Sequence, residues 1–163
     1  MSGEKIVSGF LVSKTDPKGK ITYCNQAFID ISGFTEQELL GKPHNIVRHT
    51  DMPRSIFAYL WKKIQSKEEV NVYVKNLSKD GGYYWVFANV TPSFDMNDNI
   101  IGYYSVRRKP NTQGVKIATE LYAKIREAEK NGGIESGLAF FHKYFQELGE
   151  SYENFILHTQ VEQ

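Results

Sequence analysis

A change of hydrophobic period near Lys67 is the feature that most constrains how this chain can fold. Before it, apolar residues recur at the spacing of one helix face, at Ile56, Phe57, Leu60, Trp61 and Ile64. After it, apolar residues alternate with their neighbours as in a half-buried strand, at Val70, Val72 and Val74. A helix that leads directly into a strand with one apolar face indicates an α+β fold, in which the helix covers a sheet.

Turn-forming residues divide much of the remaining chain into short, strand-like segments. Turns are predicted at 16–19, at the Lys-Asp-Gly-Gly sequence of 79–82, and at 95–99. The strands that these turns separate are expected over 9–12, 20–24, 70–76, 83–91 and 100–108. The order is therefore two early strands and a later three-stranded meander.

Short helices are expected between the second and third strands. Residues 25–31 predict one, which Gly33 ends, and the sequence 35–38 is a capping box that opens another. Asp51 is expected to cap the longer helix, with Pro53 tolerated in its first turn.

The C-terminal part of the chain has a helical pattern from Val115 onward. Its apolar stripes, interrupted by a break at 131–133, consist of Ile117, Leu121, Ile125 and Ala128 and then of Leu138, Phe141, Phe145 and Leu148. The polar segment 110–114 indicates a boundary, so we predict one domain over 8–109 and a helical C-terminal element over 115–163. The two stripes must pack on the sheet, on each other or on a partner.

Composition excludes several classes of function. A net charge of +1 gives no electrostatic footprint for nucleic acid, and no apolar run approaches the roughly 20 residues of a membrane span. The single cysteine, Cys24, excludes an internal disulfide and a Cys-x-x-Cys metal site. No acid–base or nucleophile constellation is visible. We therefore expect a cytoplasmic protein that is not an enzyme and does not insert into a membrane.

Asn76 is the strongest candidate for a ligand contact. It shares the inward face of its strand with Val72 and Val74, because strand side chains alternate. A buried amide is costly unless it is hydrogen-bonded, and it offers both a donor and an acceptor to the edge of a flat, polar ligand. The alternative is an amide bonded to a neighbouring loop.

Other basic and aromatic residues precede or line the longer helix. Arg48 is suited to holding a pyrophosphate or the negative charge of a reduced ring, but an ion pair with Asp51 explains it equally well. His49 is suited to changing its protonation state with the charge of a cofactor, but a hydrogen bond within its loop explains it equally well. Trp61 either contacts a ligand as a wall of its pocket or packs in the hydrophobic core, and Phe57 is better explained as a core residue. Weaker candidates are Asn89 and Asn25, the latter also a plausible helix cap.

The order of elements and several motifs resemble a PAS domain. The segments 16–25 and 33–42 are similar to the opening of that fold. More narrowly, the chain resembles the sensor domain of the Aer-type aerotaxis receptors at 44–53, Phe57, Trp61, 74–76, 84–86, 88–89, 91–92, 102–103 and 105–107.

This resemblance implies a PAS fold with a five-stranded antiparallel sheet, flanking helices and additional C-terminal helices. It implies non-covalent FAD, intracellular redox sensing, and signalling by contact to a membrane-bound chemotaxis transducer or another signalling protein. The chain is similar to the stand-alone PAS subunit of a bipartite energy-taxis receptor, and a homodimer is an open alternative. The implied cofactor contacts are Asn76, Trp61, Arg48, His49, Asn25, Phe57, Asn89 and Trp85.

The chain departs from these relatives at Val70, where they carry a tryptophan that supports flavin binding, so we expect partial FAD occupancy. A light-induced cysteine adduct is not expected, because Cys24 lies on an early strand. Heme is the alternative cofactor; the segment 51–67 contains no histidine, which leaves His44 or His49 as axial ligand. A cofactor-free adaptor or dimerisation module is the other alternative.

Overall fold

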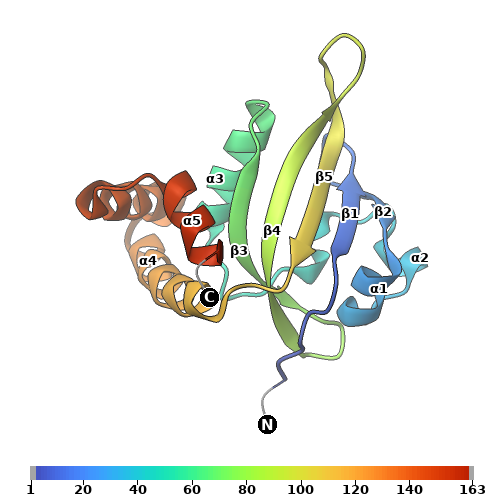
Figure 1. Ribbon diagram of the computed structural model, residues 1–163, viewed down its shortest axis with the longest axis horizontal. Helices are drawn as coiled ribbons and strands as arrows, with labels where there is room; N and C mark the ends of the chain where they lie inside the picture. Colours follow the sequence, from blue (N-terminus) through green and yellow to red (C-terminus); the bar gives the residue numbers. More distant parts are fainter. Residues whose placement is uncertain (1–2, 162–163) are drawn as a thin grey trace.

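An antiparallel sheet forms the centre of the molecule in the computed structural model, which describes residues 3–161 (Figure 1). Its five strands run in the order β2-β1-β5-β4-β3. They are β1 (Leu11–Thr15), β2 (Ile21–Cys24), β3 (Val70–Leu77), β4 (Tyr83–Phe94) and β5 (Ile100–Arg108). The predicted α+β fold, with a five-stranded antiparallel sheet, flanking helices and C-terminal helices, is confirmed.

The first strand lies later in the chain than predicted. We expected 9–12, but β1 begins at Leu11 and extends to Thr15, opposite Tyr103 of β5. Gly9 has a φ of 70°, which belongs to a turn and not to a strand. Pairing with β5, which sequence patterning does not reveal, sets the start of β1.

The register of β3 on β4 assigns each residue to one face of the sheet. Val74 lies opposite Val86, and Asn76 lies opposite Tyr84. All four are buried on the inner face, which packs against α3. The prediction that Asn76 shares a buried face with the strand's valines is therefore confirmed.

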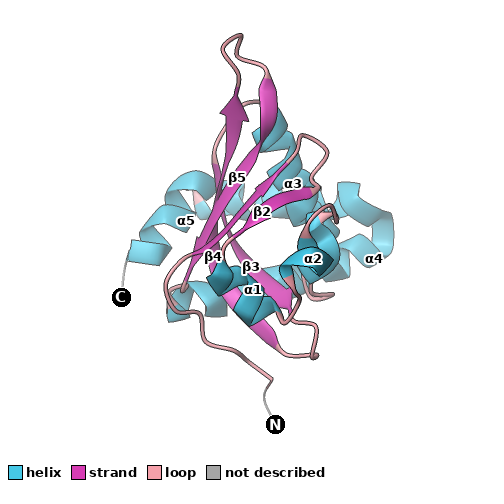
Figure 2. Ribbon diagram, turned by 90° about the vertical axis from the view of Figure 1, so that its right-hand side faces the viewer, coloured by secondary structure: helices cyan, strands magenta, loops and turns pink. Residues whose placement is uncertain are grey.

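Four short elements connect β2 to β3: α1 (Gln26–Ser32), α2 (Glu36–Leu39), the 3-10 helix η1 (His44–Val47) and α3 (Arg54–Gln65). Helices α1 and α2 lie beside β1 and β2 (Figure 2). Asn25 caps α1, and the capping box at Thr35 is formed as predicted. The predicted cap by Asp51 is wrong, because α3 starts only after Pro53 and has no side-chain cap of its own.

The C-terminal helices α4 (Thr112–Leu148) and α5 (Tyr152–Val161) pack along α3 and β3 (Figure 1). Helix α4 bends where Gly132 and Gly133 leave helical geometry. The hydroxyl of Tyr122 donates to the Tyr73 carbonyl at 2.6 Å, which ties α4 to β3. Leu121, Ile125, Phe141 and Phe145 of the predicted apolar stripes are buried, whereas Leu148 is exposed. The domain limits 8–109 and 115–163 stay predictions.

Candidate functional site

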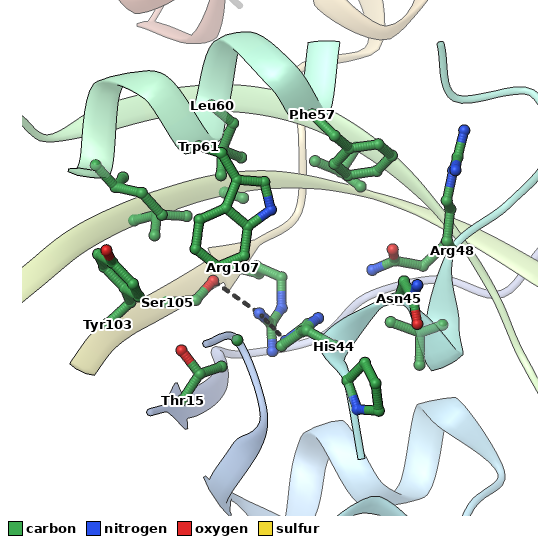
Figure 3. A pocket seen from close by; sticks show the side chains of 18 of the residues that line it. Thr15, His44, Asn45, Arg48, Phe57, Leu60, Trp61, Tyr103, Ser105 and Arg107 are labelled. Atoms are coloured by element: carbon green, nitrogen blue, oxygen red, sulfur yellow. Dashed lines mark hydrogen bonds between the residues drawn. The ribbon is translucent and has the colours of Figure 1, made fainter. Parts of the chain in front are cut away.

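A cavity of about 480 Å³ lies between α3 and the inner face of the sheet (Figure 3). This volume is in the range of small-molecule and cofactor sites. Its apolar lining includes Phe57, Leu60, Trp61, Ile64, Val74, Ala88, Val90 and Tyr103. Its polar lining includes Thr15, His44, Asn45, Arg48, Asn76, Ser105 and Arg107.

Trp61 forms one wall of the cavity. Its indole meets the ring of Tyr103 edge-on, with centroids 5.5 Å apart. Gly19, in the turn between β1 and β2, also lies against the indole, and an added Cβ there would stand 2.9 Å from it. Gly19 also has a φ of 89°, which few residues other than glycine adopt. The turn and the indole therefore close this end of the cavity together.

Asn76 supplies a polar group on the sheet side of the cavity. It is 4% exposed, and the buried Tyr84 hydroxyl next to it has no hydrogen-bond partner. Burial raises the pKa of Tyr84 to about 12, and the Arg107 charge and the Asn76 amide partly oppose this shift. The amide of Asn76 is thus available to a ligand, because no hydrogen bond of normal geometry joins it to Tyr84.

Arg48 lies at the cavity beside Asn76, to which its backbone is bridged. Its guanidinium is 5.1 Å from the centre of the Phe57 ring, and Nη2 donates to the Met52 carbonyl at 3.1 Å. Its Nε is buried without a partner. The alternative of an ion pair between Arg48 and Asp51 is not realised, since Asp51 pairs with Lys75 at 2.8 Å.

His44 and Arg107 form a polar group at the cavity; the sequence analysis considered His44 only as a heme ligand and did not assign Arg107 to the site. Arg107 Nη1 lies 2.7 Å from Ser105 Oγ and 3.3 Å from His44 Nε2, which is also 2.9 Å from Ser13 Oγ. Burial, followed by the Arg107 charge, lowers the pKa of His44 to about 3. The motif around Arg107 had entered only the resemblance; the signal for a site was a basic residue within an inward-facing strand segment.

Four of the predicted cofactor contacts do not line the cavity. Trp85 lies on the opposite face of the sheet and stacks on Tyr122, with centroids 6.2 Å apart. Asn89 is on that same face and donates to Asn71 Oδ1 at 2.9 Å. The remaining two are His49 and Asn25, whose side chains hydrogen-bond to backbone groups nearby in the chain.

His49 is held near the start of α3 by its neighbours. Its Nδ1 accepts from the Asp51 backbone N–H at 2.9 Å, and its ring meets Tyr83 edge-on. Burial, followed by the Lys75 charge, lowers the pKa of His49. The local hydrogen bond that we weighed against a cofactor role is thus the one that forms.

The salt bridge of Asp51 with Lys75 predicts a small acid-sensitive contribution to stability. The Lys75 hydrogen bond lowers the pKa of Asp51, so the contribution is present above an ordinary aspartate pKa of about 3.9 and is lost as pH falls through the lower folded pKa. Asp51→Asn should cost at most about 1 kcal/mol at neutral pH, because the carboxylate is 49% exposed. Thermal melts should show this difference vanish at acid pH, whereas the exposed Glu120→Gln should show none at either pH. A difference that persists at pH 2 would contradict the assignment.

A ligand-sized cavity between a helix and a five-stranded antiparallel sheet is the arrangement found in sensor domains. The chain belongs to the PAS family, since residues 21–107, more than half of its length, match the PAS fold. The aerotaxis receptor of Escherichia coli (strain K12) is 38% identical over 128 residues, which are 78% of this chain and 25% of that protein. The resemblance to aerotaxis sensors predicted from the motifs is thus confirmed.

Light-responsive relatives share the same domain. The blue-light photoreceptor of Listeria innocua (serovar 6a) is 29% identical over 119 residues, 71% of this chain and 46% of that protein. The chain therefore spans between a quarter and half of these two relatives. Between residues 3 and 161, no helix is both long and apolar enough to cross a bilayer.

Solved structures agree on the fold. A light-oxygen-voltage domain studied with a flavin analogue superposes with a TM-score of 0.59 at 21% identity, over 73% of this chain and 87% of that one. The light-state LOV domain of the photoreceptor Aureochrome1 gives a TM-score of 0.60 at 19% identity, over 72% and 91% of the two chains. At these identities the likeness establishes the shared architecture.

The residues at the cavity fit a flavin. Trp61, Leu60 and Val74 offer apolar walls for a flat ring, and Asn76 offers an amide to its polar edge. Within residues 3–161, the buried side-chain polar atoms that lack a partner are Arg48 Nε, Tyr84 Oη, and Arg107 Nε and Nη2. All of them are able to donate, and a flavin presents ring carbonyls, ring nitrogens and phosphates as acceptors.

Heme fits these residues less well. A guanidinium only donates, so His44 Nε2 accepts from Arg107 and the ring proton lies on Nδ1. That arrangement leaves neither nitrogen free for an axial bond unless the group rearranges. His49 does not line the cavity, and its Nδ1 is already an acceptor.

Proposed function

We propose that this chain is a redox sensor that binds FAD non-covalently in the cavity and signals by protein contact to a chemotaxis transducer. The observation that carries the proposal is the cavity itself, in which apolar walls surround unpartnered donors on Arg48 and Arg107. The similarity to an aerotaxis receptor supports the signalling class. We place the protein in the cytoplasm and assign it no catalytic role.

The chemistry that FAD supplies when bound is reversible electron uptake; the protein's own residues bind and orient it. Asn76 provides a donor and an acceptor to the polar edge of the ring, and Trp61 with Leu60 excludes water from its faces. Arg48 is placed to hold negative charge.

Cys24 distinguishes this proposal from photochemistry by adduct formation. It is buried on β2 and does not line the cavity. Burial raises the pKa of its thiol, which favours the unreactive protonated form. We therefore propose redox state, not light, as the input.

Val70 bears on how fully the cavity is occupied. It is 4% exposed and packs with Ile64, Val90 and Tyr103, each of which lines the cavity. A valine at this position offers less apolar surface to a bound ring than the tryptophan of the related domains. Partial FAD occupancy after purification remains our expectation.

The absorption spectrum of the purified protein tests the proposed cofactor. Two flavin bands are expected, and heat or acid should release a chromophore that chromatography identifies as FAD and not FMN. A Soret band would establish the heme alternative. Protein that stays colourless after flavin supplementation would favour a cofactor-free adaptor or dimerisation module.

Asn76→Ala should weaken flavin binding more than Asn25→Ala. The first change removes a buried partner of the flavin edge, at about 1–3 kcal/mol, or roughly fivefold to 150-fold in affinity. The second removes the α1 cap, whose Oδ1 accepts from the N–H groups of Phe28 and Val12, at about 1 kcal/mol of folding stability. Flavin titrations and thermal melts of both variants measure the two effects; equal affinities would refute the role of Asn76.

A further inference from the structure

Arg107 of β5 is a buried cation for which the fold provides no counter-charge. Its side chain lines the cavity (Figure 3). The residue is 3% exposed. In the part of the chain that the structure describes, no carboxylate lies within ion-pair distance of it. Burying an uncompensated charge is costly, so a buried cation of this kind is expected to bind a negatively charged partner.

The contacts of Arg107 satisfy only part of its hydrogen-bonding capacity. Nη1 donates to Ser105 Oγ and approaches His44 Nε2, while the guanidinium stacks over the Phe28 ring at 4.5 Å. Nε and Nη2 have no partner. A purely structural arginine held by a serine and a phenylalanine leaves these donors unexplained.

The group around Arg107 carries a net positive charge at neutral pH. Burial lowers the pKa of Arg107 to about 10, so the guanidinium remains protonated. His44, whose pKa is lowered to about 3, is neutral, and so is the Tyr84 hydroxyl, whose pKa is raised to about 12. Cys24, the other titratable neighbour, is neutral because its thiol pKa is raised.

We propose that Arg107 is the counter-cation for the negative charge that the bound flavin acquires on reduction, and that it thereby raises the cofactor's reduction potential. This inference rests on the proposed function. On reduction, a bound flavin would take up two electrons, which a reduced dye supplies in the test below, and one proton from solvent; one negative charge would remain on the ring for Arg107 to balance. No bond to the protein forms or breaks.

The thermodynamic reason is differential binding. A fixed cation near the ring stabilises the charged reduced form more than the neutral oxidised form, and a bound group shifts an equilibrium only by such a difference. The assignment differs from the sequence-based hypothesis for Arg48, because Arg107 is the more buried of the two and Arg48 also donates to the Met52 carbonyl.

Three variants test the charge at this position: Arg107→Met, Arg107→Lys and the matched control Arg108→Met. Arg108, the next residue, is exposed and lies over Phe87 on the other face of the sheet. Each protein is saturated with FAD, and its midpoint potential is measured by dye equilibration together with its thermal melt. Arg107→Met should lower the preference for reduced over oxidised flavin at least about tenfold, equivalent to about 30 mV for a two-electron couple. Arg107→Lys should retain most of the preference, and Arg108→Met should retain all of it.

A second measurement uses the unaltered protein, so it does not depend on a variant that folds. Uptake of one proton with two electrons gives a potential that falls by about 30 mV per pH unit, whereas two protons give about twice that slope. Between pH 6 and 8 the smaller slope is expected. His44 and Tyr84 do not titrate in that range. The other cationic side chains that line the cavity are Arg48 and Lys18.

The outcomes separate this inference from the proposed function. A flavin-loaded Arg107→Met protein with an unchanged potential, or a wild-type slope of about twice 30 mV per pH unit, overturns the role of Arg107 and leaves FAD binding intact. An unaltered protein that never binds flavin overturns both. If Arg107→Met does not fold, the pH dependence of the wild-type potential still decides whether the reduced flavin carries the negative charge that the inference requires.

Discussion

Replacing Phe141 by alanine should release α4 and α5 from α3, at a cost of about 3–5 kcal/mol. Phe141 is 2% exposed and lies at the centre of an aromatic cluster. Its ring centroid is 4.9 Å from that of Tyr59 on α3, 5.2 Å from Tyr152 on α5 and 5.1 Å from Phe145. Removing the ring leaves a cavity between three helices that cannot close without moving one of them.

Thermal melts and hydrogen exchange measure the effect of Phe141→Ala. Exchange should rise in α5 and in the second half of α4, while flavin affinity changes little, because Phe141 does not line the cavity. The control is Leu157→Ala on α5, whose side chain is 47% exposed and whose loss should cost less than about 0.5 kcal/mol. A loss below 1 kcal/mol for Phe141→Ala, with unchanged exchange, would contradict the role of the cluster.

The same variant tests whether the C-terminal helices carry the signal. Helix α3 provides cavity residues on one side and packs against α4 on the other. Glu129 of α4 accepts from the Ser55 backbone N–H of α3 at 2.7 Å. Arg126 of α4 donates to the carbonyl of Asp51, which lies just before α3. We propose that a change in the cofactor shifts α3 and is passed through these contacts.

Oxidised and reduced protein should then differ in the hydrogen exchange of α4, and Phe141→Ala should lose redox-dependent partner binding. Identical exchange in the two states, with redox-dependent binding retained by the variant, would exclude the helices as the output. A point variant is preferable to truncation, because removing both helices would expose Tyr73 and Phe87, which are 2% and 3% exposed.

Trp61→Ala should reduce flavin affinity by about tenfold to 150-fold. The indole forms a wall between Gly19 and Tyr103, and an apolar side chain of this size contributes about 1.5–3 kcal/mol when buried against a ligand. The shortened side chain opens the cavity to water at that end. Flavin titration by fluorescence quenching measures the affinity.

The matched control is Trp85→Ala, the same chemical change on the other face of the sheet. Trp85 contacts Tyr122 and not the cavity, so its loss should lower folding stability but leave flavin affinity within about twofold of wild type once the protein is folded. If both tryptophan variants lose affinity equally, the cavity is not the flavin site.

The order of elements could be predicted from the sequence because it rests on local physics. The change of period near Lys67, the capping box at Thr35 and the cap at Asn25 each depend on residues close together in the chain. The inward face of Asn76 followed from strand alternation for the same reason. Motif resemblance added the family, which periodicity alone does not distinguish.

The composition of the site was decided by the tertiary structure. Strand alternation places Trp85 and Asn89 on one face and Tyr84 on the other, but only the packing of α3 on one side and α4 on the other shows which face bounds the cavity. Asp51 illustrates the same limit, because its partner Lys75 lies 24 residues away and competes with a local capping role.

By itself, the sequence determined the α+β class, the helix caps at Asn25 and Thr35, the buried amide at Asn76 and the resemblance to aerotaxis sensors. Only the tertiary structure brought Arg107 of β5 beside His44 of η1, 63 residues apart, and left two of its nitrogens facing no partner. The physical reason is that periodicity encodes which side of an element is buried, whereas the charge balance of a cavity depends on which distant elements meet there.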